Sequence, residues 1–409
     1  MLKLLIENIS DKKGEIMAEW KNYTLEEVCE RIYSGGTPST KHEEYWNGDI
    51  KWLSSGETSQ RFVYDTERKI TQEGVENSST KLATKGCTVV ATAGQGYTRG
   101  QASFLMTDTY MNQSVIACKA NENVILPLYL YYNLDSRYEE FRLLSDGTST
   151  RGGLSGWILK RMEIKLPPKS SQKKIIDILY SIDRKIEENK AINNNLFEQM
   201  QALYKAWFVD FEPFGGVRPS NWNDTNIYAI ANIIYGAPFA SKLFNTDGLG
   251  KPIIRIRDLK EQAFVTFTTE EHPKGHLIQP GDIVVGMDGE FRPYIWGNEP
   301  AWLNQRVCIF ESNRPQGKAF VLYTIKPLLN KIEQTQVATT VIHIGKKDFD
   351  AFEIILPDEA TLDSFDSITA PMIEQIVNNR LQNKRLAVLR DTLLPKLMSG
   401  ELDVSAIDL

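Results

Sequence analysis

The sequence has 409 residues, of which 42% are hydrophobic and 24% are charged, and its formal net charge is −6. This composition is typical of a globular protein of two or three domains, and no apolar run approaches the roughly 18 residues that could span a membrane. The first ten residues, MLKLLIENIS, are too short and too acidic at their end for a secretory signal, so we expect a cytoplasmic protein. Nucleic-acid binders usually show a basic face, so in this acidic chain either the basic residues cluster or a partner supplies part of the affinity for phosphate.

The four cysteines are widely scattered and form no CxxC pair. We therefore expect reduced, buried thiols rather than a disulfide framework or a zinc site. The cysteines are Cys29, Cys87, Cys118 and Cys308.

Residues 1–19 are an N-terminal extension, because the patterned sequence begins at Trp20. Either Met1 or Met17 is the start of the protein. The first domain is expected over residues 20–168 and a second over residues 214–357.

Each domain is predicted to mix helices and strands, because short alternating runs and longer periodic runs follow one another between glycine-rich turns. Strands are expected at 88–92, 114–119, 253–256, 282–285 and 307–310, and helices at 128–144 and 320–332. Recognition residues are often found on loops of this kind.

Residues 169–213 are predicted to contain a long amphipathic helix with a heptad repeat. About 38 helical residues at roughly 1.5 Å each give it a length of about 57 Å. Pro167 and Pro168 block helix before it, Ser170 or Ser171 can cap it, and Pro213 stops it. Its seam positions are Ile175, Leu179, Ile182, Ile186, Asn189, Asn193, Leu196, Met200, Leu203 and Trp207.

A second helix, in residues 358–409, repeats this seam 190 positions later. Thr369 and Arg390 weaken it, and Pro395 should kink or end it. Its seam positions are Phe365, Thr369, Met372, Ile376, Asn379, Asn383, Leu386, Arg390, Leu393 and Leu397. The alternative is a pair of unrelated surface helices, but Asn at matching seam positions (189 and 379, 193 and 383) favours a register-fixing pair.

The repeat extends into the domains, with an offset that shrinks from 202 to 190 along the chain. Asn112-Gln113-Ser-Val matches Asn304-Gln305-Arg-Val, and the run that ends at Pro167 matches the run that ends at Pro357. The chain is therefore organised as domain, helix, domain, helix.

No catalytic or metal motif stands out. The run Gly94-Gln-Gly96-Tyr-Thr-Arg-Gly100 has one residue too many for GxGxxG, so a tight loop is the better interpretation. The histidines His272 and His276 are separated by Pro273 and Gly275, which argues against helical metal-ligand spacing.

Several segments resemble the specificity subunit of type I restriction–modification enzymes. SGGTPST (34–40) with EYWNGDIKWL (44–53) resembles the start of a target-recognition domain. QKKIIDIL (172–179), AWFVDFEP (206–213) and LPKLMSGEL (394–402) resemble the entry and exit of the first conserved helix and the end of the second. The second domain departs from the pattern, since Gly236-Ala-Pro238 replaces the Gly-Gly-Thr-Pro start.

The resemblance implies an α+β protein with two pseudo-repeated target-recognition domains, separated by two helices that form an antiparallel coiled coil. Such a subunit is not an enzyme. It reads a bipartite site in double-stranded DNA and docks two methyltransferase subunits, which bind S-adenosylmethionine and methylate adenine at N6. Restriction subunits add ATP- and Mg-dependent cleavage, and the chain itself binds no cofactor or metal.

Arg, Lys, Asn and Gln read base edges, whereas Ser, Thr, Lys and loop amides hold phosphates. In the first domain the candidates are Thr37, Ser39, Thr40, Lys41, Gln95, Tyr97, Arg99, Thr148, Ser149 and Arg151. In the second they are Lys242, Arg255, Arg257, Arg292, Thr339 and Thr340. If Arg99 reads a base, Arg99→Ala should cost about 1–3 kcal/mol of binding, and unchanged affinity and site preference would remove it from the candidates.

Two alternatives stay open at this point. One is a self-sufficient methyltransferase or nuclease, which the missing motifs argue against. The other is a coiled-coil adaptor that binds only protein, which the loops rich in Gly, Thr and Arg argue against. For the seam, we expect that replacing Asn189 and Asn379 with Leu raises stability and loosens register.

Overall fold

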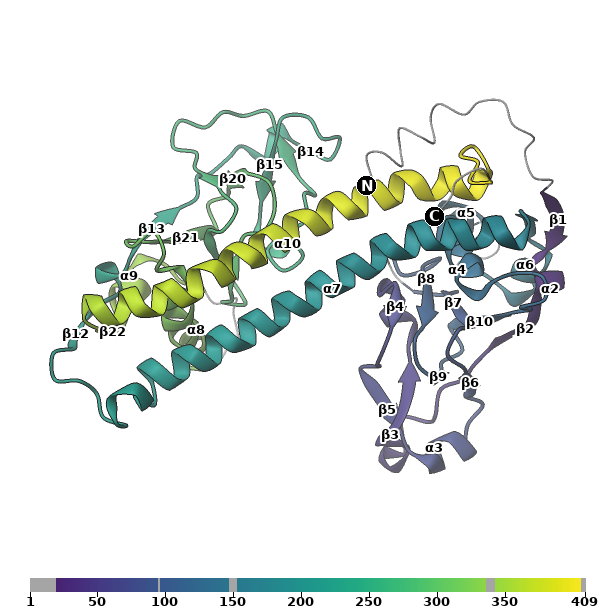
Figure 1. The fold of residues 1–409 in the computed structure, drawn as a ribbon, viewed down its shortest axis with the longest axis horizontal. Coiled ribbons are helices and arrows are strands. Elements are labelled where there is room, and N and C mark those ends of the chain that lie inside the picture. The colour runs from purple at the N-terminus through teal and green to yellow at the C-terminus, as the bar shows by residue number, and fades with distance from the viewer. Residues whose placement is uncertain (1–19, 95, 147–152, 336–342, 406–409) are drawn as a thin grey trace. The chain divides into compact units, whose positions relative to one another are not determined.

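The computed structural model describes residues 20–94, 96–146, 153–335 and 343–405. Its contacts divide the chain into two units, Met1–Asp183 with Val388–Leu409, and Arg184–Ala387. We describe each unit by itself (Figure 1).

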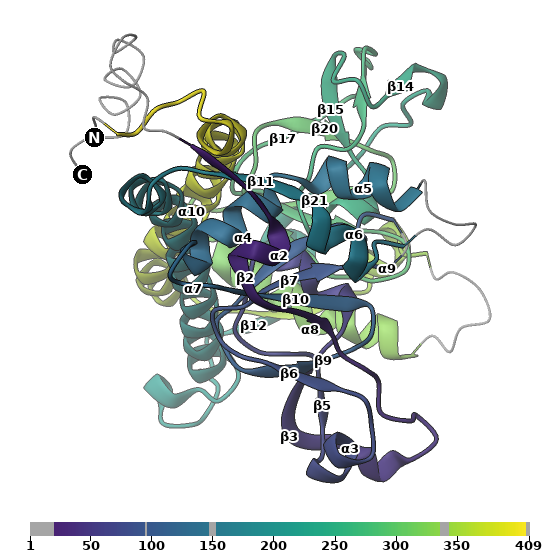
Figure 2. The ribbon, with the colours of Figure 1, turned by 90° about the vertical axis from the view of Figure 1, so that its right-hand side faces the viewer.

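The first domain is built on a five-stranded sheet of order β2-β10-β7-β8-β4. Its central strands are apolar on both faces, so most of their side chains are fully buried. The strands are β2 (Cys29–Ser34), β10 (Val115–Ala120), β7 (Thr88–Ala91), β8 (Ala102–Leu105) and β4 (Phe62–Val63). Figure 2 shows β2, β10 and β7 running side by side. The strands predicted at 88–92 and 114–119 are confirmed.

A second sheet of the first domain has the order β5-β3-β9-β6, with β3 and β9 parallel. Its strands are β5 (Arg68–Ile70), β3 (Trp46–Leu53), β9 (Thr109–Met111) and β6 (Lys81–Ala83). A separate pair joins β1 (Lys21–Thr24) to β11 (Glu163–Leu166). The helices are α2 (Leu25–Val28), α3 (Gln72–Glu76), α4 (Pro127–Asp135), α5 (Tyr138–Asp146) and α6 (Gly156–Arg161), and the 3₁₀ turns are η1 (Glu43–Tyr45) and η2 (Ser55–Ser59).

The single helix predicted at 128–144 is wrong, because the structure has two helices, α4 and α5. The Ser136 hydroxyl donates to the Asn133 carbonyl at 2.7 Å and competes with the helical hydrogen bonds at this point. The Arg137 guanidinium donates to the Glu163 carbonyl at 2.9 Å, which ties the break between the helices to β11.

The second domain repeats this plan. Its sheets have the orders β13-β21-β18-β19 and β14-β16-β15-β20-β17, with β15 and β20 parallel, and β12 pairs with β22. The strands are β12 (Asn223–Asn226), β13 (Ala231–Tyr235), β14 (Phe244–Asn245), β15 (Lys251–Ile254), β16 (Phe267–Thr268), β17 (Leu277–Ile278), β18 (Ile283–Gly286), β19 (Pro293–Ile295), β20 (Ala301–Leu303), β21 (Val307–Ser312) and β22 (Glu353–Leu356). The helices are α8 (Lys318–Thr335) and α9 (Lys346–Asp350), with turns η4 (Ile227–Ala229), η5 (Ser241–Leu243) and η6 (Ile256–Asp258).

These elements confirm the strands predicted at 282–285 and 307–310 and the helix predicted at 320–332. The strand predicted at 253–256 ends two residues early, at Ile254, because η6 begins at Ile256. The shared strand orders confirm the internal repeat at the level of topology.

The first long helix, α7, spans Lys169–Phe208. Two predictions about its ends are wrong. The Gln172 N–H donates to the Pro168 carbonyl at 3.0 Å, so Ser170 and Ser171 lie inside the first turn and do not cap it. At the other end the helix stops five residues before Pro213, where Phe211 adopts a left-handed φ of 54° and the turn η3 (Glu212–Phe214) begins.

The second long helix, α10, spans Glu359–Ser399. Of the two outcomes predicted at Pro395, a kink or an end, the end is wrong, because the helix continues to Ser399. Pro395 and Asp391 lie on its exposed face, where solvent can satisfy the carbonyl that loses its N–H partner.

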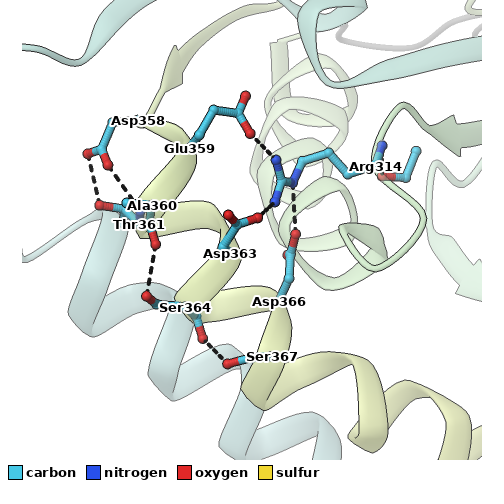
Figure 3. A network of polar contacts seen from close by, with 10 residues as sticks. Arg314, Asp358, Glu359, Ala360, Thr361, Asp363, Ser364, Asp366 and Ser367 are labelled. Carbon is cyan, nitrogen blue, oxygen red and sulfur yellow. Dashed lines mark hydrogen bonds and ion pairs between the residues drawn. The ribbon is translucent and has the colours of Figure 1, made fainter.

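Arg314 ties the start of α10 to the second domain. Its guanidinium contacts the carboxylates of Glu359 and Asp363 and lies 2.8 Å from Asp366, whose side chain is only 2% exposed (Figure 3). Asp358 caps the helix, because its carboxylate accepts hydrogen bonds from the Thr361 N–H and hydroxyl at 3.0 and 2.9 Å.

The predicted seam is confirmed by burial. On α7, seven of its ten positions are buried and three are half-buried, and α10 shows the same division. In the second unit, the amides of Asn189 and Asn193 contact those of Asn383 and Asn379, each at 2.8 Å. The lower-numbered residue on α7 meets the higher-numbered one on α10, so the pairing is antiparallel.

All four cysteines are free and buried, as predicted. Among the residues that the structure describes, none of the helices combines the length and apolar character needed to cross a membrane.

Candidate nucleic-acid interface

Loops gather at one end of the five-stranded sheet in the first domain. The last residues of β2 and β7 both pair with the start of β10, since Ser34 lies opposite Ile116 and Ala91 opposite Val115. The loops that follow β2 and β7 therefore leave the sheet beside the Asn112-Gln113 turn that precedes β10. Leu154 also lies at this end, because its N–H donates to the Thr92 carbonyl at 3.0 Å.

The loop after β2 needs a glycine at its first position. A Cβ at Gly35 would lie 1.9 Å from the Met111 carbonyl oxygen, so no other residue fits against β9. The second domain keeps this requirement, because a Cβ at Gly236 would lie 2.0 Å from the Asn304 carbonyl oxygen. Ala237 follows it in place of the second glycine. The departure from Gly-Gly-Thr-Pro therefore preserves the turn.

Thr37 and Gln113 connect two of the loops. The Thr37 hydroxyl donates to the Gln113 Oε1 at 2.5 Å, which holds the exposed Gln113 amide in one orientation. The structure thus brings Thr37 to the sheet end, and the exposed side chains of Ser39, Thr40 and Lys41 follow it on the same loop.

Two side chains of α5 hold the loop after β7 through hydrogen bonds to its backbone. The Tyr138 hydroxyl donates to the Tyr97 carbonyl at 3.0 Å, and Arg142 donates to the Gly96 carbonyl at 2.8 Å. The Tyr97 ring itself is 84% exposed, so the loop presents a large aromatic face to solvent. Arg99 is half-buried on the same loop.

Some predicted residues fall outside the described ranges. These are Gln95, Thr148, Ser149 and Arg151 in the first domain and Thr339 and Thr340 in the second.

The second domain forms the equivalent sheet end. Tyr235 at the end of β13 lies opposite Cys308, and Gly286 at the end of β18 lies opposite Val307 at the start of β21. The turn before β21 carries Gln305, which is exposed like its repeat counterpart Gln113.

Sequence reasoning missed a charged trio at this end. The Asp288 carboxylate lies 3.6 Å from the Arg306 Nε and 2.6 Å from the His343 Nδ1. Asp288 is largely buried, whereas the side chains of Arg306 and His343 are 54% and 56% exposed. One carboxylate thus holds two donor-bearing side chains at the surface.

The predicted basic residues of the second domain have different surroundings. Lys242 is exposed on η5, and Arg257 is exposed on η6. Arg255 donates to the Thr266 hydroxyl, which turns part of its donor set inward. Arg292 forms a two-pronged contact with Glu333, and this hydrogen bond raises the pKa of the guanidinium, so binding an anion there requires breaking the pair.

Gln113 and Gln305 were also missed as candidate readers. The Asn-Gln repeat is a signal in the sequence, but by itself it aligns the two domains and does not indicate where the glutamines lie. What makes them candidates is the sheet ends, which place each exposed amide between loops.

Within the described ranges, no group of three or more His, Cys, Asp or Glu side chains could hold a metal ion. The His272 Nδ1 accepts the Lys274 N–H at 3.1 Å and is therefore already engaged in its loop.

Comparisons with known proteins give a consistent result. A family model described as the type I restriction modification DNA specificity domain matches residues 17–198 and 219–390. The MjaIX specificity subunit from Methanocaldococcus jannaschii is 28% identical over 96% of this chain and 96% of its own length. The HindI specificity subunit from Haemophilus influenzae is 22% identical over 94% of this chain and 100% of its own length. The crystal structure of a type I system S subunit from M. genitalium shares the fold, with a TM-score of 0.57 and 17% identity over 94% of this chain and 98% of that one.

Proposed function

The chain belongs to the type I restriction-modification DNA specificity family, and we propose that each of its two target-recognition domains reads one half of a bipartite, asymmetric DNA site. Members of this family are the non-catalytic DNA-recognition components of type I restriction enzymes, and the resemblance stated from the sequence is confirmed. The observation that carries the proposal is the pair of exposed glutamines, Gln113 and Gln305, at equivalent sheet ends.

The chemistry of the two sheet ends supports base reading. A glutamine amide pairs with adenine through one donor and one acceptor, and arginine pairs with guanine in the same two-pronged way. Gln113 is accompanied by the Thr37 hydroxyl, whereas Gln305 is followed by Arg306 in the trio with Asp288. The two domains therefore present different donor sets, which is why we expect two different half-sites.

The remaining predicted residues suit phosphate contacts. The exposed hydroxyls and amine of Ser39, Thr40 and Lys41 could hold the DNA backbone beside the Gln113 amide. Because the chain carries a net charge of −6, we propose that it binds DNA weakly alone and that partner subunits supply much of the phosphate affinity.

The two long helices are proposed to set the distance between the half-sites. Half-sites read from one face of a duplex lie about one turn, roughly 34–36 Å, apart. Helix α7 has 40 residues, which at about 1.5 Å each give about 60 Å, enough for such a spacer. The internal repeat supplies the approximate two-fold symmetry that two identical methyltransferase subunits need for docking.

On this proposal the chain works in the cytoplasm without a cofactor of its own. The methyltransferase subunits bind S-adenosylmethionine and methylate adenine at N6, and restriction subunits joined through them use ATP and Mg.

A methylation map tests the proposal. The chain is co-expressed with the methyltransferase subunit of its system, and host DNA is sequenced for N6-methyladenine, with Gln113→Ala and Gln305→Ala variants in parallel. We expect an asymmetric bipartite motif that is absent without the chain and is degraded in one half by each variant. A stable complex that produces no new methylation would favour an adaptor that binds only protein.

A further inference from the structure

A buried cluster of charges joins α7 to α10 in the first unit. Arg390 on α10 donates through Nη1 to the Asp183 carboxylate on α7 at 2.8 Å. The side chains of Asp183 and Arg390 are 2% and 10% exposed. Arg61 lies 3.3 Å from Asp183 and 2.9 Å from Asp135, and the Tyr132 hydroxyl donates to Asp183 at 2.8 Å. Arg390 also contacts the carboxylate of Asp391, which is 59% exposed, at 2.8 Å. Asp183 and Arg390 are thus the most buried charged residues of this cluster.

The asparagines of the seam cannot distinguish one helix from the other. Asn189 meets Asn383 and Asn193 meets Asn379, and each residue on α7 has an asparagine counterpart 190 positions later on α10. If two copies of α7 paired in the same antiparallel register, Asn189 would meet Asn193 and the same amide contacts would form. These asparagines therefore specify register without specifying the partner.

The pair of Asp183 and Arg390, unlike the asparagines, cannot form when two copies of the same helix pair. The repeat counterparts of Asp183 and Arg390 are Ile373 and Met200, which lie in the apolar core of the second unit with 5% and 0% exposure. Pairing two copies of α7 would set Asp183 against Met200, and pairing two copies of α10 would set Arg390 against Ile373. Either arrangement breaks the ion pair between the helices and sets each charge against an apolar side chain. Among the residues that the structure describes, Asp183 then keeps only Arg61 and Tyr132, and Arg390 keeps only Asp391 on its own helix. Losing the opposite charge at a largely buried position is unfavourable.

We propose that the Asp183–Arg390 pair selects α10 as the partner of α7 and excludes pairing between like helices of two copies of this chain. The two halves resemble each other so closely that their apolar seam alone would permit that exchange. Well-packed apolar residues often replace a buried ion pair without loss of stability, so choice of partner explains the pair better than stability does. The proposal does not depend on DNA binding.

The test converts the pair into its apolar counterparts. Two differently tagged copies of the full chain, both carrying Asp183→Ile with Arg390→Met, are co-expressed, and complexes that carry both tags are isolated. We expect a folded protein and a several-fold rise in mixed-tag complexes over the wild-type baseline. The charge-conserving control Arg390→Lys should stay near that baseline.

The single variants separate choice of partner from general instability. Asp183→Ile and Arg390→Met each leave one buried charge without its partner on the other helix, both in the native pairing and in a like pairing. They should therefore unfold more readily than the double variant and yet form fewer mixed-tag complexes. If mixing instead follows instability, so that the single variants mix most, the proposal is overturned.

A second pair of substitutions keeps the proposal testable if the apolar pair prevents folding. If the apolar pair does not yield a folded chain, Asp183→Asn with Arg390→Gln removes the charges and keeps polar groups. A folded neutral variant that mixes no more than wild type overturns the proposal. Failure of both pairs to fold also overturns it, because the charges would then be needed for helix pairing itself.

Discussion

The amide pair of Asn193 and Asn379 offers a quantitative test of the seam. The Asn379 Nδ2 donates to the Asn193 Oδ1 at 2.8 Å, and the two residues are 4% and 5% exposed. Replacing one of them with Leu leaves a buried amide without its partner, which costs about 1–3 kcal/mol. Replacing both leaves neither amide in the seam, and the hydrogen bond between them, with a net contribution of about 0.5–1.5 kcal/mol, is lost once. The bonds from Asn193 to the Ile376 carbonyl and from Gln375 to Asn379 are lost in the single variants as well, so they cancel in a cycle.

A double-mutant cycle isolates this difference. The gain from burying each Leu side chain is present in the single variants and in the double variant, so it cancels. We expect Asn193→Leu and Asn379→Leu to be coupled by about 2–3 kcal/mol, with the double variant more stable than the sum of the single variants predicts. Urea unfolding of the four proteins supplies the free energies.

Asn189 and Asn379 form the matched control, because they belong to different amide pairs. Replacing both orphans two partners, Asn383 and Asn193, and we therefore no longer expect the gain in stability that the sequence alone suggested. The coupling in this second cycle should be well below that of the first. A coupling under about 0.5 kcal/mol between Asn193 and Asn379 would refute the reasoning, because the orphaned amide would then cost nothing.

Three further outcomes are expected. Gln113→Ala and Gln305→Ala should each cost about 1–3 kcal/mol of DNA binding and relax the preference at one position of one half-site, measured on a panel of oligonucleotides with the methyltransferase present; equal losses on every sequence would assign the side chain to phosphate instead. Arg314→Ala should destabilise the second unit by about 2–4 kcal/mol, because it leaves the buried Asp366 without its counterion, and thermal unfolding beside Arg314→Lys checks this. Burial raises the pKa of Tyr33 from 10.0 to about 12, so the folded state keeps a proton that the unfolded state loses and stability falls as pH rises through this window; Tyr33→Phe should make that fall shallower in denaturation series at alkaline pH, and an unchanged slope would contradict it.

Local patterns were sufficient to predict the long helices and the repeat. The seam is a periodic signal carried by the helix itself, and the asparagines were identified because they interrupt it at matching places. The C-terminal end of α7 was harder to predict. The helix ends at Phe208 and a left-handed residue, Phe211, follows it, which no residue type in the sequence indicates.

Long-range contacts explain the remaining differences. The break between α4 and α5 depends on Arg137 reaching β11, and Pro395 is tolerated because of the face on which it lies. Gln113 and Gln305 stand out only when the strand pairings bring their turns beside the loops. The trio around Asp288 joins residues 288, 306 and 343, which no spacing rule connects.

The small pairs β1–β11 and β12–β22 have a consequence for how the chain can change. Lys21 lies opposite Leu166, and Asn223 lies opposite Leu356, so each domain begins and ends at neighbouring points just before its long helix. The backbone of each domain therefore starts and finishes at neighbouring positions, so the domain is a unit whose two ends adjoin. Genetic exchange of such a cassette would replace the surface that we propose faces DNA while leaving the helix and its seam unchanged, so new specificity can arise without rebuilding the long helices.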